Sequence, residues 1–226
     1  MSWSESVREK TETEFKAILE LPFIKELAAG TLPGALFSRY MEQDEIYLGV
    51  NARQMKEYAA LLKNPSDRAL FEAFAASSLE SETDMHALLS ERFGIKAAGA
   101  AASRVTEAYC AHTQAAIDSG GKEVALAALL PCLWVYNMVG LHILGCARLD
   151  GNPYREWIEA YGDEAFSDGV RQVLEMVDAM AENGSEELRS EMDRQFSEAV
   201  ELEYAFWDYA YYGESGDYSY IEKYEH

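Results

Sequence analysis

Apolar residues recur at helical spacing along almost the whole chain, in segments bounded by polar and turn-forming residues. One long segment covers residues 36–62, and the next covers 64–94, with an Asn-Pro start and a glycine end that are typical of a helix. Further helical segments cover 103–121, 124–147, 152–162, 163–184 and 185–213. No run alternates with period two for long enough to predict a strand. The pattern predicts an all-α, multi-helix bundle of roughly seven or eight helices.

The segment 124–147 contains no Asp, Glu, Lys or Arg, and its length alone would let it cross a membrane. However, Pro131, Asn137, His142 and two glycines interrupt it, and no second such segment exists. A helix that is apolar on all sides is also typical of the centre of a soluble bundle, which is the position we expect. Pro131 has no N–H to donate to the carbonyl of Ala127, so we also expect a kink or a free carbonyl there.

The composition indicates a globular protein with an acidic surface. The 226 residues carry 40 acidic and 19 basic side chains, a formal net charge of −21, which disfavours nucleic acid and anionic membranes as partners. The three cysteines form no CxxC pair, and the N-terminus lacks the apolar core of a signal peptide. We therefore expect reduced thiols and a cytoplasmic protein. Short connections between the helical segments predict a single domain.

In a bundle, functional sites are built from polar side chains on apolar helical faces. Asp44 and Tyr47 are three residues apart and share a face, as do Cys132 and Tyr136, four apart. The local pattern leaves alternatives open, because Asp44 could be a surface carboxylate beside a core tyrosine. Cys132 could be a small buried hydrophobe, since a nucleophilic cysteine needs access and something that favours its thiolate.

Glu203 and Phe206 form a third pair of this kind in the aromatic stretch "VELEYAFWDYAYY". If Glu203 is buried among these rings, desolvation raises its pKa and suits it to act as a general acid. The alternative is a charge on the solvent side of an amphipathic helix. Tyr109 and Tyr161 are further candidates, although each could equally be a core residue.

The sequence favours neither a metal nor a bound cofactor. Di-iron bundles use paired Glu-x-x-His motifs, and none of the four histidines has a glutamate three residues earlier. Glu82 precedes His86 by four residues, without a second motif to complete a site. Glycine-rich phosphate loops and a serine nucleophile elbow are also lacking.

Five stretches, in order and at the right spacing, resemble the TenA/thiaminase II family: "FSRYMEQDEIYL", "RVTEAYCAHT", "LLPCLWVYNMVG", "YREWIEAYG" and "LEYAFWDYAY". The resemblance implies the all-α, haem-oxygenase-like bundle without haem, assembled as a homotetramer. It also implies hydrolysis at a carbon attached to the methylpyrimidine ring of thiamin or of its breakdown products. On this reading the chain is a single domain over 1–226, with a core at about 5–212 and a C-terminal tail at 213–226.

The resemblance assigns roles to individual residues. Cys132 matches the family's nucleophile, Glu203 its catalytic glutamate, and Asp44 the carboxylate that holds the aminopyrimidine. The residues that match the aromatic lining of the pocket are Tyr47, Tyr109, Tyr136, Tyr161 and Phe206.

Some positions depart from the family pattern. Glu45 stands where many relatives have an aromatic residue, and Met138 where many have an acidic one, which leaves substrate detail open. Cys132 places the chain in the cysteine-bearing branch of the family. Two other functions remain as alternatives, a non-catalytic binding or regulatory protein and a cofactor-free oxidase on the same bundle. The joint presence of Cys132 and Glu203 favours the hydrolase, because a mere binder needs no nucleophile.

Overall fold

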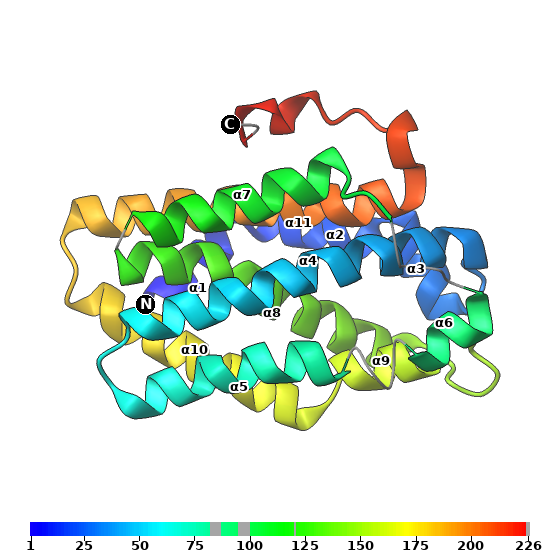
Figure 1. Cartoon of the computed structure of the whole chain (residues 1–226), viewed down its shortest axis with the longest axis horizontal. Coiled ribbons are helices and arrows are strands. Elements are labelled where there is room, and N and C mark those ends of the chain that lie inside the picture. Colours follow the sequence, from blue (N-terminus) through cyan, green and yellow to red (C-terminus); the bar gives the residue numbers. More distant parts are fainter. Residues whose placement is uncertain (82–86, 95–99, 120, 225–226) are drawn as a thin grey trace.

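A computed structural model describes residues 1–81, 87–94, 100–119 and 121–224, and these residues form helices and no strand, as predicted (Figure 1). The α-helices are α1 (Trp3–Lys10), α2 (Glu12–Glu20), α3 (Pro22–Ala29), α4 (Gly34–Leu61), α5 (Pro65–Ser81), α6 (Ala87–Phe93), α7 (Arg104–Asp118), α8 (Lys122–Cys146), α9 (Arg155–Tyr161), α10 (Glu164–Glu182) and α11 (Glu186–Tyr212). Two 3₁₀ segments follow, η2 (Gly213–Ser215) and η3 (Ser219–Tyr224). The described helices outnumber the predicted seven or eight, because residues 3–29 form three short helices and the 64–94 segment contains both α5 and α6.

Short polar side chains set where several helices begin. The hydroxyl of Ser103 accepts from the Thr106 backbone N–H at 3.1 Å, and that of Ser185 accepts from Leu188 N–H at 3.2 Å. Each bond satisfies a backbone donor that the first turn of a helix leaves without a partner. These caps fix the first residues of α7 and α11, the helices that later contribute Tyr109 and Glu203 to one site.

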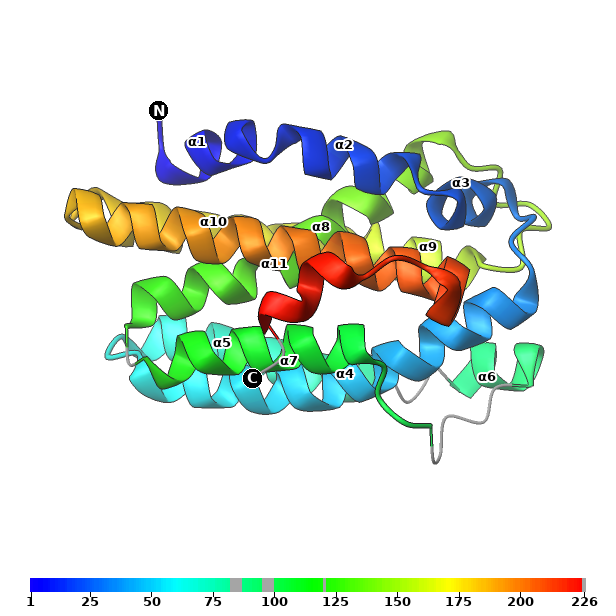
Figure 2. The same cartoon turned by 90° about the horizontal axis from the view of Figure 1, so that it is seen from above.

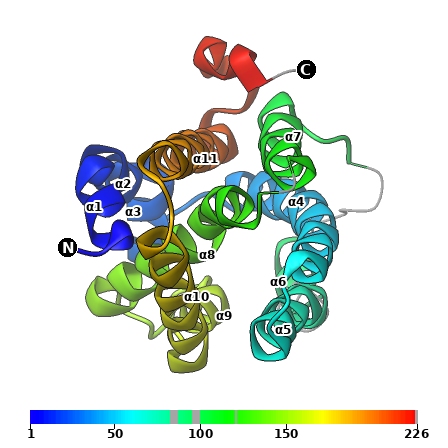
Figure 3. The ribbon, with the colours of Figure 1, turned by 90° about the vertical axis from the view of Figure 1, so that its left-hand side faces the viewer.

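The apolar helix α8 lies at the centre of the bundle, surrounded by α4, α7, α10 and α11 (Figure 3). The helix is long and apolar enough to cross a membrane, but 78% of its most apolar 18-residue stretch is buried inside the protein. The prediction of a central core helix is therefore confirmed. The helix continues through Pro131 to Cys146 instead of ending at the proline.

The C-terminal segment after α11 folds back along the bundle and ends against α7 (Figure 2). Ile221 is fully buried there, and the Tyr224 hydroxyl donates to Glu201 of α11 at 3.1 Å. The ring of Tyr224 also meets the edge of His112 on α7, with ring centres 5.4 Å apart. The segment thus joins α7 and α11 on their outer side.

Candidate active site

One face of α4 carries a row of buried polar groups. Tyr40, Asp44, Tyr47 and Asn51 follow one another at spacings of four, three and four residues, and none is more than 3% exposed. This spacing keeps all four on one side of a helix, here the side that faces α8 and α11. Asp44 is 1% exposed, so the alternative of a surface carboxylate is excluded.

Gln43, next to Asp44, fixes how α4 lies against the start of α7. Its side-chain oxygen accepts from the Ser103 backbone N–H at 2.8 Å and from the Thr106 hydroxyl at 2.7 Å. Its amide nitrogen donates to the Ala101 carbonyl at 3.1 Å. The two bonds to the Gln43 oxygen are buried, and they help to hold the register between the two helices that carry Asp44 and Tyr109.

The opposite wall of the site comes from α8. The Tyr136 hydroxyl donates to Asp44 Oδ1 at 3.2 Å and lies 3.4 Å from the Tyr40 hydroxyl, which itself accepts from Trp157 Nε1 at 3.2 Å. The Tyr161 ring packs on that of Tyr136, with centres 5.0 Å apart. The carboxylate of Asp44 is thus surrounded by aromatic side chains.

Cys132 lies on α8, one turn before Tyr136, and is 7% exposed. Burial raises the pKa of its thiol well above the ordinary value, and repulsion by Glu203 adds to this. The Tyr47 hydroxyl acts in the opposite direction, because it donates a hydrogen bond that favours the thiolate. The pKa of Cys132 therefore depends on both Glu203, which raises it, and Tyr47, which lowers it. The other two thiols, Cys110 and Cys146, are half-buried and exposed, respectively, and all three are free.

Glu203 projects from α11 into the same interior and is 1% exposed. Its Oε1 accepts from the Tyr109 hydroxyl at 2.7 Å, while Oε2 has no hydrogen-bond partner among the described residues. Burial raises the pKa of Glu203 to about 8, against the Tyr109 hydrogen bond, and the charge of Asp44 raises it further. The alternative of a solvent-facing charge is excluded, and the carboxyl is protonated at neutral pH.

Aromatic rings connect these groups. The Tyr47 ring lies 4.7 Å from that of Tyr109 and 5.9 Å from that of Phe206, measured between centres. The structure therefore brings together all eight residues singled out from the sequence, from α4, α7, α8, α9 and α11: Asp44, Tyr47, Tyr109, Cys132, Tyr136, Tyr161, Glu203 and Phe206.

Sequence reasoning missed three polar neighbours of this site, namely Gln43, Asn51 and Trp157. Asn51 had a visible signal, because it continues the 40–44–47 face of α4 by one more turn. Gln43 and Trp157 had none, since their partners lie more than fifty residues away in the sequence.

The position of Tyr161 depends on Gly140, on the α8 turn after Tyr136. A Cβ atom at Gly140 would lie 2.4 Å from both the carbonyl carbon and the oxygen of Tyr161. Only a residue without a side chain allows the end of α9 to approach α8 this closely.

We expect Gly140→Ala to push the end of α9 away from α8 and to destabilise the protein by about 1–3 kcal/mol, the usual cost of overpacking. The substrate KM should rise with the displacement of Tyr161. Gly145→Ala is the matched control on the same helix, because nothing lies within 4 Å of its added methyl group. Urea unfolding of both variants provides the measurement, and equal stability of the two would contradict the close contact.

Among the described residues, no group of three or more His, Cys, Asp or Glu side chains is arranged to hold a metal ion. The Glu82–His86 pair and His226 lie outside the described residues.

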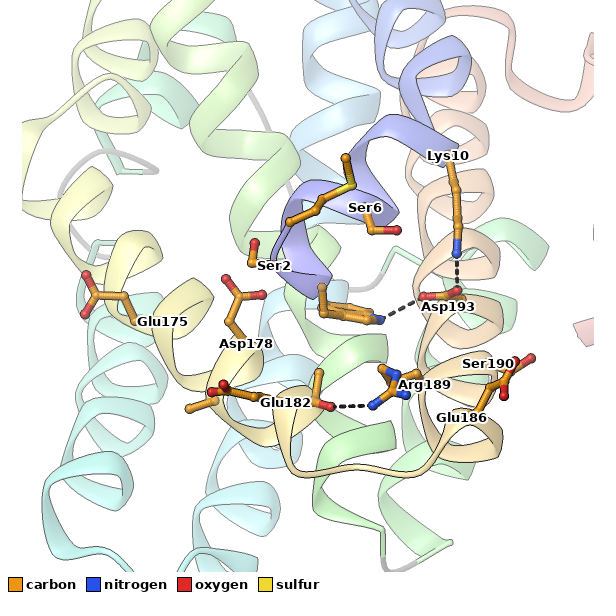
Figure 4. A pocket seen from close by; sticks show the side chains of 14 residues that line it. Ser2, Ser6, Lys10, Glu175, Asp178, Glu182, Glu186, Arg189, Ser190 and Asp193 are labelled. Carbon is orange, nitrogen blue, oxygen red and sulfur yellow. Dashed lines mark hydrogen bonds and ion pairs between the residues drawn. The ribbon is translucent and has the colours of Figure 1, made fainter.

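A separate surface pocket lies between α1, α10 and α11 (Figure 4). Its polar side chains form hydrogen bonds with α1, the N-terminal helix. Asp178 accepts from the backbone N–H and the hydroxyl of Ser4, both at 2.7 Å, and Asp193 accepts from Trp3 Nε1 at 2.8 Å and from Lys10 at 2.6 Å. These hydrogen bonds hold α1 against α10 and α11, and none of the residues that line the pocket belongs to the interior site.

Comparison with known proteins gives a consistent result. A sequence model described as the TENA/THI-4/PQQC family matches residues 10–213. A protein of Bacillus subtilis named aminopyrimidine aminohydrolase is 32% identical over 229 residues, covering 100% of this chain and 96% of that protein. This match includes the C-terminal tail.

Solved structures agree on the fold. A TenA homologue from P. horikoshii OT3 superposes with a TM-score of 0.84 at 25% identity, covering 93% of this chain and 99% of that one. A Shewanella denitrificans domain described as having a heme oxygenase-like fold gives a TM-score of 0.68 at 17% identity, covering 92% of this chain and 91% of that one. The predicted haem-oxygenase-like bundle is therefore confirmed.

Proposed function

The chain belongs to the TENA/THI-4/PQQC family, and on that premise we propose that it is an aminopyrimidine hydrolase of thiamin metabolism. The reaction replaces the amine, or the thiazole, on the methylene group of a 4-amino-2-methylpyrimidine with a hydroxyl from water. One observation carries the proposal: Asp44, Cys132 and Glu203 come from three different helices and are all buried in the same aromatic interior.

The site suits a flat, electron-poor ring with a polar edge. The aromatic side chains around Tyr136 and Phe206 offer faces for stacking. Asp44 offers its side-chain oxygens as hydrogen-bond acceptors to the ring's amino group. In this proposal Tyr47, Tyr109, Tyr136, Tyr161 and Phe206 line and order the pocket.

The proposed chemistry uses Glu203 and Cys132 in turn. Glu203 gives its proton to a ring nitrogen, which makes the ring an electron acceptor. The Cys132 sulfur then adds to a ring carbon and its proton passes to the departing amine, and the electron pair that the sulfur supplies expels that amine from the methylene carbon. Water adds to that carbon and gives a proton back to Glu203. The C–S bond then breaks, the sulfur takes up the ring proton, and hydroxymethylpyrimidine leaves, with the amine as the second product.

The electrostatics of the site link the protonation of the two groups. The negative charge of an ionised Glu203 raises the pKa of Cys132, so a protonated Glu203 makes the thiolate easier to form. A carboxyl with a pKa of about 8 holds its proton at neutral pH and can still release it to a base. A protein that only bound the ring would need neither property.

The proposal extends to the setting of the enzyme. We place it in the cytoplasm as a homotetramer, without a metal or cofactor, and with thiamin or its aminomethyl-pyrimidine breakdown product as substrate. Turnover of the two compounds by the purified wild-type chain, followed by chromatography of the pyrimidine product, tests the activity and ranks the substrates. Failure to hydrolyse either would overturn the proposed function.

We expect Asp44→Asn to weaken binding of the hydroxymethylpyrimidine product by roughly 10- to 100-fold, the scale of a buried charge-assisted hydrogen bond. The amide offers one acceptor oxygen instead of two, and its N–H groups would face the ring's amino group. Titration calorimetry measures the loss. Glu45→Gln is the control, because Glu45 is the exposed neighbour on α4. Unchanged affinity in the Asn variant would show that Asp44 does not contact the ring.

A further inference from the structure

The row of buried polar groups on α4 continues beyond the residues assigned to the site. Asn51, Gln54 and Tyr58 extend it at the same helical spacing, and none of them is more than 1% exposed. Each has a side-chain oxygen without a hydrogen-bond partner among the described residues, namely Asn51 Oδ1, Gln54 Oε1 and the Tyr58 hydroxyl. The inner face of α4 therefore offers more polar groups than its protein neighbours use.

The facing side of α7 carries a group of the same kind. Thr113 lies one turn after Tyr109, is 1% exposed, and its hydroxyl has no hydrogen-bond partner among the described residues. Gln54 Nε2 donates to the Cys110 carbonyl at 2.8 Å and to the Gln114 side chain at 3.3 Å, on the same turn of α7. Gln54 and Thr113 therefore lie at the same level of the bundle, next to the site.

Small side chains from the other two helices face this part of the interior. Ala128 lies one turn before Cys132 on α8, with Ala125 a further turn away on the same face. Ala199 lies one turn before Glu203 on α11. All three alanines are fully buried, and α4, α7, α8 and α11 all contact one another. An alanine offers no hydrogen bond to the polar atoms of α4 and α7 and fills little space beside them.

These features favour internal water. A buried amide oxygen or hydroxyl without a partner costs free energy, and a water molecule held by two to four polar groups removes that cost. Asn51, Gln54 and Thr113 supply three such groups from two facing helices. All three are uncharged, so they suit a neutral ligand that both donates and accepts hydrogen bonds.

We propose that the interior between α4 and α7, beside Tyr109, binds water through Asn51, Gln54 and Thr113, and that this water supplies the hydrolytic step. The second part rests on the proposed function. Tyr109 connects the two places, because it lies one turn before Thr113 and its hydroxyl donates to Glu203 at 2.7 Å. In that step the water oxygen forms a bond to the methylene carbon, one O–H bond breaks, and the proton passes to the Glu203 carboxylate.

A high-resolution crystal structure of the wild-type protein tests the site directly. Ordered water should lie at about 2.7–3.2 Å from the Asn51 side chain and from the Thr113 hydroxyl. Close packing of protein atoms around both side chains, with no ordered water at either, would overturn the proposal.

Thr113→Val tests the same site in solution, because valine keeps the shape of threonine without its hydroxyl. If the hydroxyl binds water, the melting temperature should fall by about 2–4 °C. If the hydroxyl is unpaired, the melting temperature should rise, which would contradict the water site. Thr11→Val gives the scale, since Thr11 is also buried and its hydroxyl donates to the Val7 carbonyl at 2.8 Å.

Kinetics test the role in hydrolysis. Thr113→Val should lower kcat by roughly 3- to 10-fold, the scale of one lost hydrogen bond, with product affinity within about twofold of wild type. Because the amine departs before water adds, rapid-quench assays of this variant should show a burst of amine followed by slower release of hydroxymethylpyrimidine. Thr11→Val should turn over at the parental rate, because Thr11 lies on the N-terminal helices, away from the site.

A parental kcat in Thr113→Val, or a slower kcat without the burst, would overturn the supply of water from this site. Either result leaves the proposed function intact, since that function fails only if the wild-type enzyme hydrolyses neither substrate. The crystal structure and the melting temperatures do not depend on activity, so they test the water site in either case.

Discussion

Replacement of Cys132 with serine is expected to reduce hydrolysis by on the order of 10⁴-fold or more, the scale seen when a covalent nucleophile is removed. Serine keeps nearly the same size, so the packing of α8 should change little. Its hydroxyl, however, is far from ionised near neutral pH, and burial disfavours its anion even more than it disfavours the thiolate. Binding of the hydroxymethylpyrimidine product should stay within a few-fold of wild type.

Single-turnover assays and titration calorimetry separate these two effects. Cys110→Ser and Cys146→Ser are the controls. Cys146 is exposed, and burial raises the pKa of Cys110 to about 12, so neither offers a second nucleophile. If the Cys132→Ser enzyme turned over at a near-normal rate, the covalent step would have to be abandoned.

Glu203→Gln should lower kcat/KM by roughly 10²–10⁴-fold, the usual contribution of general acid–base catalysis. Glutamine keeps the shape of the side chain and its bond to Tyr109 but has no proton to give. In the wild-type enzyme, activity should fall as the pH rises through about 8, where Glu203 loses its proton. The variant should lack this alkaline limb. An unaltered pH profile in the Gln enzyme would rule out Glu203 as the acid.

Stability provides an independent check on the same group. The folded protein holds the Glu203 proton up to about pH 8, whereas an unfolded chain releases it near the ordinary glutamate pKa of 4.5. Wild-type stability should therefore be greatest below pH 4.5 for this group and decline as the pH rises to about 8. At about 1.4 kcal/mol per pKa unit, the loss amounts to a few kcal/mol.

Urea unfolding at pH 5 and pH 9 measures this loss. The Glu203→Gln protein should keep its stability over that range, and Glu187→Gln, at an exposed position on the same helix, should behave like wild type. An equal pH dependence in all three proteins would show that Glu203 is not the buried acid described above.

The sequence by itself determined the helices of this protein. Apolar residues at a spacing near 3.6, with local caps and glycine stops, predicted α4, α7, α8, α10 and α11 closely. The central place of α8 also followed, because a helix without charges has to be covered on all sides. Within the predicted 64–94 segment the structure describes α5 and α6, and residues 82–86 between them lie outside the described part of the chain.

The family resemblance singled out the eight site residues, but the local pattern left their environment open. The local sequence around Glu203 is compatible with either a solvent-exposed or a buried carboxylate. Only the packing of α11 against α7 and α8 decides that Glu203 is buried beside Tyr109, and burial in turn sets its pKa. Desolvation is a property of the assembled interior, and no local spacing encodes it.

The same reason explains the contacts that sequence reasoning missed. Gly140 and Tyr161 are brought together by the turn between α8 and α9, and the bond between Gln43 and Thr106 spans two helices. Periodicity reports which side of a helix is buried, whereas the tertiary structure decides which groups meet there.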